Sequence, residues 1–312
     1  MKIALKVTSI LIAGLILLAA GGFTLEDRRA HDNDEARGTR IVAAGDIASC
    51  DSEGDEATAD LVERINPDAV LTLGDNAYEN GTAKDYQDCY DPSWGRFKYK
   101  TYPALGNHDY GEDGYEGISG STYDSSAYFD YFGDRVGRRD EGWYSYDLGD
   151  WHFVVLNSNC DDGIGCDPYS KQLQWLSKDL SQTSARCVLA YWHHPLYSSG
   201  YHGDDPKMRA AWNVLYGYHA DVILNGHDHH YERFPLQDPY GNFDPGNGIR
   251  QFTVGTGGKS LRQPTTAKPN SEALSNATYG VLQLTLRQGG YDWEFKPTEA
   301  GAFSDSGSDD CH

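Results

Sequence analysis

The sequence predicts an α/β domain built around a largely parallel sheet. From about residue 40 onward, short apolar runs that end in Gly-Asp or Gly-Asn alternate with stretches of helical periodicity. Such alternation is typical of parallel sheets, because the chain must cross over the sheet before it can add the next parallel strand. With 312 residues, 39% of them hydrophobic, the chain is long and apolar enough to bury a sizeable core.

The first half of the predicted domain contains three apolar runs. RIVAAGD at 40–46 and AVLTLGD at 69–75 are predicted strands, and TADLVERI at 58–65 is a predicted helix between them. The third run ends in ALGNHD at 104–109. Residues 110–146 are rich in Gly, Asp, Ser and Tyr and lack a sustained period. We expect them to form a long ordered excursion that either packs on the surface or shapes a cleft.

The second half continues the alternation and ends in a hairpin. A first predicted hairpin, at 142–157, turns at Gly149-Asp150. The elements predicted after it are a helix at 170–182, a strand at 187–192, a helix at 204–218, a strand at 220–226 and a hairpin at 278–295 that turns at Gly289-Gly290. We expect the acidic residues 301–312 to form a loose tail, so that the folded domain spans 40–300.

The N-terminal residues are predicted to lie outside this domain. Two lysines precede an apolar run over 7–20, followed by two glycines, which indicates a secretory signal peptide over 1–22. An uncleaved membrane anchor is the alternative, because the run is nearly long enough to span a bilayer. Residues 23–39 are charged and almost free of large apolar groups, so we expect a flexible acidic linker. The domain is therefore expected to be secreted, extracellular or periplasmic, or membrane-anchored if the leader is retained.

Six cysteines fit an oxidising compartment and a structural role. Cys160 and Cys166 enclose a short loop of Gly and Asp residues and are the most plausible local disulfide. Cys50 with Cys89 and Cys187 with Cys311 complete the pairing without independent support. The sequence has no Cys-x-x-Cys or Cys/His finger spacing, which argues against cysteine as a metal ligand.

The net charge is strongly negative. Against 47 aspartates and glutamates the chain has only 26 lysines and arginines, which gives −21 at pH 7. A chain of this charge is repelled by a nucleic acid backbone and by anionic lipid, so we expect neither as a partner. We expect no stable membrane partner unless the leader remains uncleaved.

Metal-capable side chains stand where the apolar runs end. They are Asp46 in AAGDI, Asp75 and Tyr78 in TLGDNAY, Asn107 and His108 in ALGNHD, His193 in LAYWHHP, and His227 and His229 in ILNGHDHH. The carboxyl ends of parallel strands converge on one edge of a sheet, where loops bring side chains distant in sequence together. Each motif alone is weak, since a lone Gly-Asp is usually a turn. Together, and in this order, they predict a polydentate metal pocket.

This set of motifs (GD, GDN, GNHD, HHP and GHDH) resembles the signature of the calcineurin-like metallophosphoesterases, from Arg40 to about Phe295. Many members begin with Asp-x-His, whereas here Asp46 has no such histidine, and Tyr78 follows three residues after Asp75. In this the chain is similar to the purple acid phosphatases, in which a tyrosinate binds a ferric ion. It is most similar to their small form, which lacks an N-terminal sandwich domain. The resemblance implies a four-layer α/β/β/α sandwich with mixed sheets.

The resemblance also implies a role for each residue of the pocket. Asp46, Tyr78 and His229 would hold the ferric ion, Asn107, His193 and His227 a divalent ion (Fe, Zn or Mn), and Asp75 would bridge the two. Two carboxylates and a tyrosinate carry three negative charges against five on the ions, which leaves a positive pocket for an anionic phosphate ester. A trivalent ion can also deprotonate a tyrosine, whose free pKa is about 10.

Three more residues are expected to act in catalysis. His108, directly after a ligand, matches the family's catalytic histidine and would protonate or stabilise the leaving group. Asp109 would orient His108, as a carboxylate does for an imidazole. His202 in YSSGYHG resembles a substrate-contacting histidine, and an exposed loop position is the alternative.

Other polar residues near the motifs have structural interpretations. His194 stands in a variable position beside a ligand, and His152 and His230 are expected to be packing or surface histidines. Glu232-Arg233 is read equally well as an ion pair that fixes its loop or as a substrate contact. VGTGG at 254–258 lacks the Lys-Ser/Thr of a phosphate loop and is a predicted strand-end turn near the site.

We therefore predict a secreted enzyme of the acid phosphatase type. It would hydrolyse phosphate monoesters, small-molecule or protein, by attack of a metal-bound hydroxide. A phosphodiesterase or nucleotidase of the same superfamily, with two divalent ions and an idle Tyr78, is the alternative within the class. A non-catalytic metal- or phosphate-binding protein is the alternative outside it.

Overall fold

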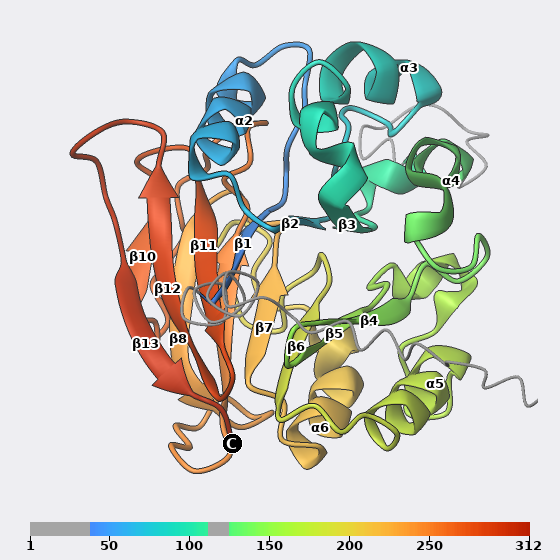
Figure 1. The fold of residues 1–312 in the computed structure, drawn as a ribbon, viewed down its shortest axis with the longest axis vertical. Coiled ribbons are helices and arrows are strands. Elements are labelled where there is room, and N and C mark those ends of the chain that lie inside the picture. Colours follow the sequence, from blue (N-terminus) through green and yellow to red (C-terminus); the bar gives the residue numbers. More distant parts are fainter. Residues whose placement is uncertain (1–37, 112–124) are drawn as a thin grey trace, which may run out of the picture. The chain divides into compact units, whose positions relative to one another are not determined.

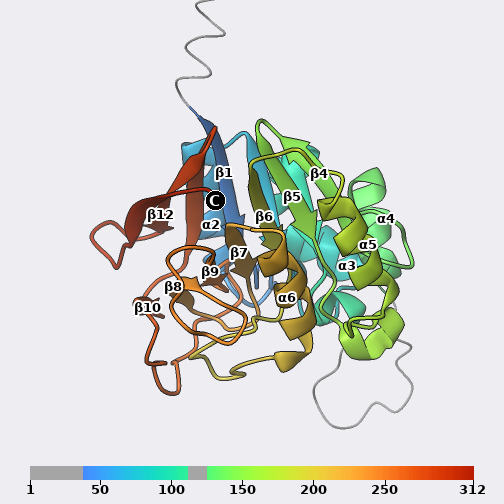
Figure 2. The same ribbon diagram turned by 90° about the horizontal axis from the view of Figure 1, so that it is seen from below.

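The computed structural model of the chain describes residues 38–111 and 125–312. Within these residues two mixed β-sheets pack together, with helices on their outer sides (Figure 1). Figure 2 shows the same layers from below, with α5 and α6 lying against the sheet that contains β5, β6 and β7. The predicted α/β sandwich with two mixed sheets is confirmed. The predicted signal peptide at 1–22, most of the predicted linker and part of the tyrosine-rich excursion lie outside the described residues.

The first sheet contains the strands nearest the start of the domain. Its order is β13-β12-β11-β1-β2-β3, with β1, β2 and β3 parallel and the other neighbours antiparallel. The strands are β1 (Thr39–Ala44), β2 (Ala69–Leu73), β3 (Thr101–Ala104), β11 (Gly280–Arg287), β12 (Gly290–Pro297) and β13 (Ser306–Asp310). The predicted C-terminal hairpin is present, and its turn lies one residue earlier than expected, at Gln288–Gly289.

The second sheet has the order β10-β8-β9-β7-β6-β5-β4, and β5, β6, β7 and β9 are parallel to one another. The strands are β4 (Tyr144–Leu148), β5 (Trp151–Val155), β6 (Cys187–Tyr191), β7 (Val222–Asn225), β8 (Tyr231–Gln237), β9 (Ile249–Val254) and β10 (Ala273–Ser275). The hairpin of β4 and β5 turns at Gly149-Asp150, as predicted. Continuous apolar runs form β5, β6 and β7 because a strand covered on both faces needs no polar alternation.

The helices cover the outer faces and the connections between strands. They are α2 (Gly54–Ile65), α3 (Ala83–Asp85), α4 (Ser126–Phe132), α5 (Lys171–Leu180) and α6 (Arg209–Gly217). Short turns of 3₁₀ or π helix are Tyr86–Tyr90, Trp94–Lys100, His108–Tyr110, Gly133–Arg135, Cys160–Ile164 and Pro206–Met208. Helix α2 ends where Asn66 adopts a left-handed backbone with φ of 49°, a common helix stop. Helix α4 lies in the stretch for which no period was found in the sequence.

Apolar side chains fill the space between the two sheets and a second layer under α5 and α6. Val42 and Leu71 from the first sheet and Phe153 and Leu189 from the second belong to one buried cluster. Each such side chain contributes about 1.5–3 kcal/mol relative to an exposed position. The outer cluster holds the inner faces of α5 and α6 against the second sheet. The strand ends are thus fixed by packing on both sides.

All six cysteines form disulfides, in the three pairs assigned from the sequence. The bond between Cys187 and Cys311 joins the first residue of β6 to the end of the chain. Among the described residues, no helix is long and apolar enough to cross a bilayer.

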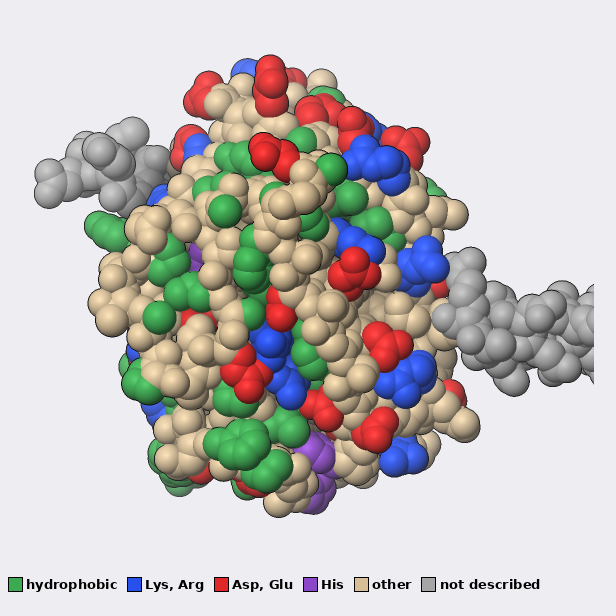
Figure 3. Space-filling view, turned by 90° about the vertical axis from the view of Figure 1, so that its left-hand side faces the viewer, with side chains coloured by type: hydrophobic (Ala, Val, Ile, Leu, Met, Phe, Trp, Pro, Cys, Tyr) green, Lys and Arg blue, Asp and Glu red, His purple; other side chains and the backbone are tan. Residues whose placement is uncertain are grey.

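The C-terminal segment corrects an expectation. Residues 301–312 were expected to be a loose acidic tail, but residues 306–310 form β13, which pairs antiparallel with β12. The segment is polar and has no apolar alternation, so no strand pattern is visible in it. Backbone pairing and the disulfide at Cys311 hold it in place. On the face shown in Figure 3, acidic and basic side chains are interspersed rather than gathered into a field of one sign.

Candidate metal centre

The loops after six strands, β1, β2, β3, β6, β7 and β9, meet at one edge of the sandwich. Hydrogen bonds between backbone groups join them directly: Asp46 N–H donates to the Gly74 carbonyl at 3.1 Å, and Gly226 N–H to the His193 carbonyl at 3.0 Å. Gly45 N–H donates to the carbonyl of Val254, the last residue of β9. The carboxyl ends of parallel strands from both sheets therefore supply one shared site, as expected for open α/β sheets.

Three of the predicted ligands have an unusual backbone conformation. Asp46, Asp75 and His227 have φ values of 60°, 51° and 71°. A left-handed conformation costs a residue other than glycine roughly 1–2 kcal/mol, and such residues concentrate at functional sites. Glycine is required nearby for space. A Cβ atom on Gly106 would lie 2.1 Å from Asp75 Oδ1, and one on Gly226 would lie 2.8 Å from Asp46 Oδ2.

The first half of the site surrounds the Tyr78 hydroxyl. This oxygen lies 2.8 Å from Asp75 Oδ2 and 3.1 Å from Asp46 Oδ1. His229 Nε2 lies 3.4 Å from the same oxygen and 3.2 Å from Asp46 Oδ1. The other ring nitrogen of His229 is 2.7 Å from Ser260 Oγ, which fixes the ring. Two carboxylates, a phenol and an imidazole thus point at one buried position.

The second half lies on the other side of Asp75. His193 Nε2 is 3.2 Å from Asp75 Oδ2 and 3.2 Å from His227 Nδ1. His193 Nδ1 donates to the Leu73 carbonyl at 2.8 Å, which leaves the Nε2 lone pair facing the site. Asn107 Oδ1 is buried and has no hydrogen-bond partner among the described residues. Asp75 therefore lies between both groups of donors, and Asn107 presents an acceptor that only a cation or a bound molecule would satisfy.

The electrostatics of the cluster favour bound cations. Burial, and then the carboxylates of Asp46 and Asp75, raise the pKa of Tyr78 well above its usual value. Burial also opposes ionisation of Asp75, yet His193 and His108 hold the pKa of this carboxyl well below its usual range. Burial lowers the pKa of His193, but the facing carboxylates outweigh it and raise that pKa to about 9. Neither Asp46 nor Asp75 is paired with a lysine or arginine in the described part of the chain.

The donor set fits a centre of two metal ions. Ligand atoms of Asp46, Asp75 and His193 lie within 4.8 Å of one another, as do those of His193, His194 and His227. Oxygen donors surround Tyr78, and an amide and two imidazoles lie on the other side of Asp75; both sets are ligand types that bind metal ions in proteins. A third group, Cys187, Asp221 and Cys311, is no such site, because its two sulfur atoms form a disulfide.

His108 lies at the mouth of the site, and its orienting partner differs from the expected one. Its Nδ1 is 2.6 Å from the Glu79 carbonyl, and its ring centroid is 4.4 Å from that of Tyr78. Asp109, which we expected to orient His108, instead accepts hydrogen bonds from Tyr86 Oη at 2.6 Å and from Gly106 N at 2.9 Å. Burial and the charge of Asp75 raise the pKa of Asp109 to about 6. Asp109 thus fixes the loop behind the ligands.

His202 lies beside the predicted divalent position. Its ring centroid is 4.3 Å from that of His227, and its Nε2 accepts a hydrogen bond from Arg262 at 2.8 Å. Arg262 is half-buried and, within the described ranges, has no carboxylate partner. Arg262, Lys259 and Ser260 were not predicted from the sequence, because the loop after β9 carries no motif. A signal was available only in the predicted strand-end turn at 254–258, which the structure confirms.

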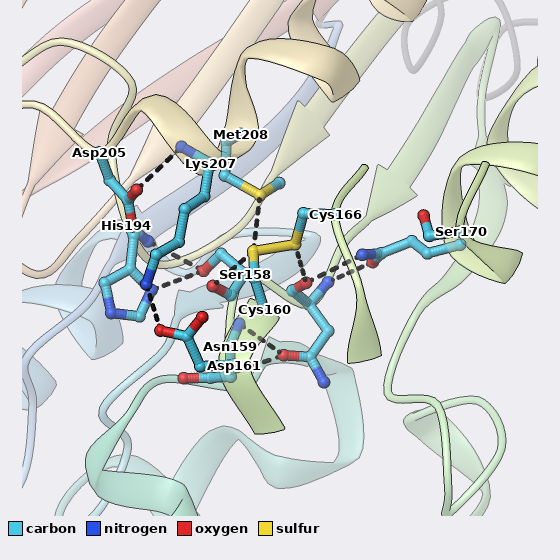
Figure 4. The surroundings of a disulfide bond; sticks show 12 residues. Ser158, Asn159, Cys160, Asp161, Cys166, Ser170, His194, Asp205, Lys207 and Met208 are labelled. Carbon is cyan, nitrogen blue, oxygen red and sulfur yellow. Dashed lines mark hydrogen bonds and ion pairs between the residues drawn. A yellow bond between two sulfur atoms is a disulfide. The ribbon is translucent and has the colours of Figure 1, made fainter. Parts of the chain in front are cut away.

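His194 is held at the edge of the ligand cluster by a disulfide-bonded loop (Figure 4). Its Nδ1 lies 2.8 Å from Ser158 Oγ, and its ring centroid is 4.3 Å from that of His227. Ser158 stands two residues before Cys160, the first residue of the disulfide-closed loop, and Cys160 Sγ lies 3.3 Å from the Ser158 carbonyl. The disulfide therefore supports a side chain that packs on a predicted ligand.

His152, His230, Glu232 and Arg233 each contact side chains outside the predicted ligand set. His152 is buried, with Nδ1 2.7 Å from Asp147 and Nε2 2.8 Å from Asp179. His230 contacts Glu232 at 3.2 Å, and the same carboxylate accepts from the Ser199 backbone. Arg233 pairs with Asp305 and Glu272 rather than with its neighbour.

Comparison with known proteins gives a consistent result. The family described as calcineurin-like phosphoesterase matches residues 39–231. Purple acid phosphatase 15 of Arabidopsis thaliana is 30% identical over 227 residues, which are 62% of this chain and 40% of that protein. Acid phosphatase type 7 of Mus musculus is 27% identical over 259 residues, 71% of this chain and 56% of that protein.

Among solved structures, a purple acid phosphatase from yellow lupin seeds has the same fold. It superimposes with a TM-score of 0.71 at 21% identity, covering 86% of this chain and 53% of the lupin chain. This chain thus spans about half the length of the relatives it matches.

Proposed function

The chain belongs to the calcineurin-like phosphoesterase family, which implies a centre of two metal ions, and on this premise we propose that it hydrolyses phosphate monoesters. The ions we propose are one ferric and one divalent. Asp46, Tyr78 and His229 would hold the first, Asn107, His193 and His227 the second, and Asp75 would be shared. When bound, such ions supply Lewis acidity and lower the pKa of a coordinated water.

One observation carries the choice of a ferric ion. The Tyr78 hydroxyl lies between the carboxylates of Asp46 and Asp75, in a buried position where its pKa is well above the usual value. Two divalent ions would compete poorly with the proton on this phenol. A trivalent ion adds the charge needed to displace it, so a tyrosine in this place favours the purple acid phosphatase type over an all-divalent phosphodiesterase.

The residues around the ions would orient the substrate and supply the proton. His108 is fixed through Nδ1 by the Glu79 carbonyl and is partly exposed at the mouth, so its other nitrogen would serve the leaving alkoxide. Arg262 donates to His202, and its remaining N–H groups would contact phosphoryl oxygens. His202 would then position Arg262. Asp109 would act only through the loop it fixes.

The proposed substrates are small-molecule or protein phosphate esters, and the proposed location is outside the cytosol. Three disulfides support an oxidising compartment. A secreted or periplasmic protein, or one anchored by a retained leader, would satisfy this condition. The charge of −21 gives no support to binding of a nucleic acid backbone.

The test combines metal analysis, an optical spectrum and two substrates. We expect the purified protein to contain iron, to absorb in the visible range, and to prefer nitrophenyl phosphate over bis-nitrophenyl phosphate. Tyr78→Phe should abolish the absorption. Tyr128→Phe is the matched control, because Tyr128 is also fully buried but donates to the Pro103 carbonyl.

Three results would contradict the proposal in different ways. Unchanged absorption in Tyr78→Phe would remove the tyrosinate. A preference for the diester would favour the phosphodiesterase alternative. Full metal occupancy without hydrolysis of either substrate would indicate a binding protein.

A further inference from the structure

The loop at 255–262, directly after β9, packs against every side chain proposed for the ferric position. Lys259 N–H donates to the Asp46 carbonyl at 2.9 Å, and Ser260 Oγ lies 2.7 Å from His229 Nδ1. Close approach is possible because Gly255 has no side chain: a Cβ there would lie 2.9 Å from Asp46 Oδ2. The loop therefore contacts each of the residues proposed to hold the ferric ion.

Within this loop, Lys259 places its ammonium over the Tyr78 ring. The Lys259 Nζ lies 4.9 Å from the ring centroid, within the range of a cation–π contact. Two partners hold it there: an ion pair with Glu79, and Ser49 Oγ at 3.2 Å. Only 18% of the Lys259 side chain is exposed, so solvent screens its charge less than that of a surface lysine.

A cation in this position has a specific consequence for a phenolate. The oxygen of Tyr78 faces two carboxylates, and in the described part of the chain Lys259 is the lysine or arginine whose charge lies over its ring. A positive charge beside the ring stabilises negative charge on the phenolate. It also raises the energy of any transition that moves electron density away from the ring.

We propose that Lys259 is a positioning residue that tunes a ferric tyrosinate at Tyr78 through the charge it holds over the ring. The inference rests on the proposed function, since it requires iron bound to this tyrosine. It goes beyond an ion pair that merely closes the loop, because such a pair would leave the electronic state of Tyr78 unaffected. Groups that orient ligands in this way commonly tune the metal they surround.

The experiment measures the visible absorption band of the iron-containing protein. In Lys259→Met we expect the tyrosinate-to-iron band to move to longer wavelength by on the order of 10 nm, because the cation that raised the transition energy is gone. Lys259→Arg keeps the charge and should keep the band. Lys268→Met is the control, since Lys268 is also partly buried and pairs with Asp204 at 2.9 Å without lying over a ring. Iron content and circular dichroism are recorded for each variant.

A second variant tests the same idea with the opposite sign. Glu79→Gln leaves the backbone carbonyl that holds His108 and neutralises the carboxylate that pairs with Lys259. The unneutralised ammonium should then move the band to shorter wavelength. This variant decides the question if Lys259→Met does not fold.

The outcomes separate the inference from the proposed function. A wild-type protein that contains iron but shows no tyrosinate band overturns the ferric tyrosinate, and the inference with it. A wild-type band that is unmoved in both Lys259→Met and Glu79→Gln overturns only the inference. Folded Lys259→Met that has lost its iron also overturns it, because the side chain would then hold the site together rather than tune it.

Discussion

Aspartates lie beside histidines at both ends of the parallel strands, but the two clusters differ in how their charges are paired. At the carboxyl ends, Asp46 and Asp75 face Tyr78 and three imidazoles, and within the described residues neither carboxylate meets a lysine or arginine. At the amino ends, His152 lies between two carboxylates that each contact one ring nitrogen.

The difference teaches how to read a buried cluster of Asp and His. A cluster whose members satisfy one another is part of the scaffold, as at His152. A cluster in which carboxylates face a phenol, and in which Asn107 Oδ1 has no partner among the described residues, is arranged for a ligand that the protein does not itself supply. Residue type alone does not distinguish the two ends.

Of the variants that test this comparison, Asp75→Asn is expected to have the largest effect. If Asp75 is shared as proposed, both ions lose a negative ligand in Asp75→Asn, and we expect kcat for a phosphate monoester to fall roughly a thousandfold. The metal-free variant should melt below metal-free wild type, because the carboxylate that His193 and His108 stabilise in its charged form has been removed. Asp147→Asn, the same exchange at the amino end, should keep its activity. Steady-state kinetics and thermal melts with a chelator measure this, and activity within tenfold of wild type in Asp75→Asn would contradict the assignment.

Removal of the Cys187–Cys311 disulfide tests how much a covalent bond at the amino end of β6 contributes to the free energy of unfolding. Because this bond closes a sequence separation of 124 residues, its loss should lower the free energy of unfolding by about 3 kcal/mol. Denaturant unfolding of the double serine variant measures the change, and kcat should remain near that of wild type at low temperature. The Cys160–Cys166 bond spans only 6 residues, so its removal should cost less stability. Equal losses for both bonds would show that loop length does not determine the effect.

Substitution of His152 tests whether the histidine at the amino end contributes to stability rather than to catalysis. The side chain is 8% exposed and contacts two carboxylates, so His152→Gln should lower the free energy of unfolding by about 2 kcal/mol near pH 6. The catalytic rate should not change, because the residue lies at the other end of the strands. Urea unfolding and kinetics on one sample decide the matter. A large loss of activity at unchanged stability would place His152 in the site instead.

The smallest predicted effect is the pH dependence of this contribution. Burial lowers the pKa of His152, but Asp179 and Asp147 outweigh it and raise that pKa above the ordinary value of about 6.5. A raised pKa means that the stabilisation is fully present below pH 6.5 and is lost as the pH rises through the folded-state pKa. The difference in melting temperature between wild type and His152→Gln should therefore shrink with increasing pH. A difference that grows would show that His152 is neutral in the folded protein.

Much of the site was predictable because it follows from local pattern. Each predicted ligand stands at or within a few residues of the end of an apolar run, and the topology of a parallel sheet brings such positions together. The α/β class, the two hairpins and the Cys160–Cys166 disulfide followed in the same way from runs, turns and spacings, whereas the four-layer sandwich followed from the family resemblance.

What escaped prediction depends on contacts between residues far apart in the sequence. Lys259 lies over Tyr78 across 181 positions, and nothing beside either residue signals the other. Asp109 stands next to His108, yet it turns away to Tyr86 and Gly106. β13 is polar throughout and is held by backbone pairing to β12, a bond type that leaves no trace in side-chain pattern.

The left-handed backbone at Asp46, Asp75 and His227 also limits how this chain would diverge over evolutionary time. Only glycine and a few short polar residues, among them asparagine, tolerate that conformation at small cost. Drift at Asp46 or Asp75 would thus pass most easily through asparagine, which keeps the shape of the loop and removes a charge. A descendant protein that had lost the carboxylate charge, and with it the activity, would therefore keep the same loop conformation.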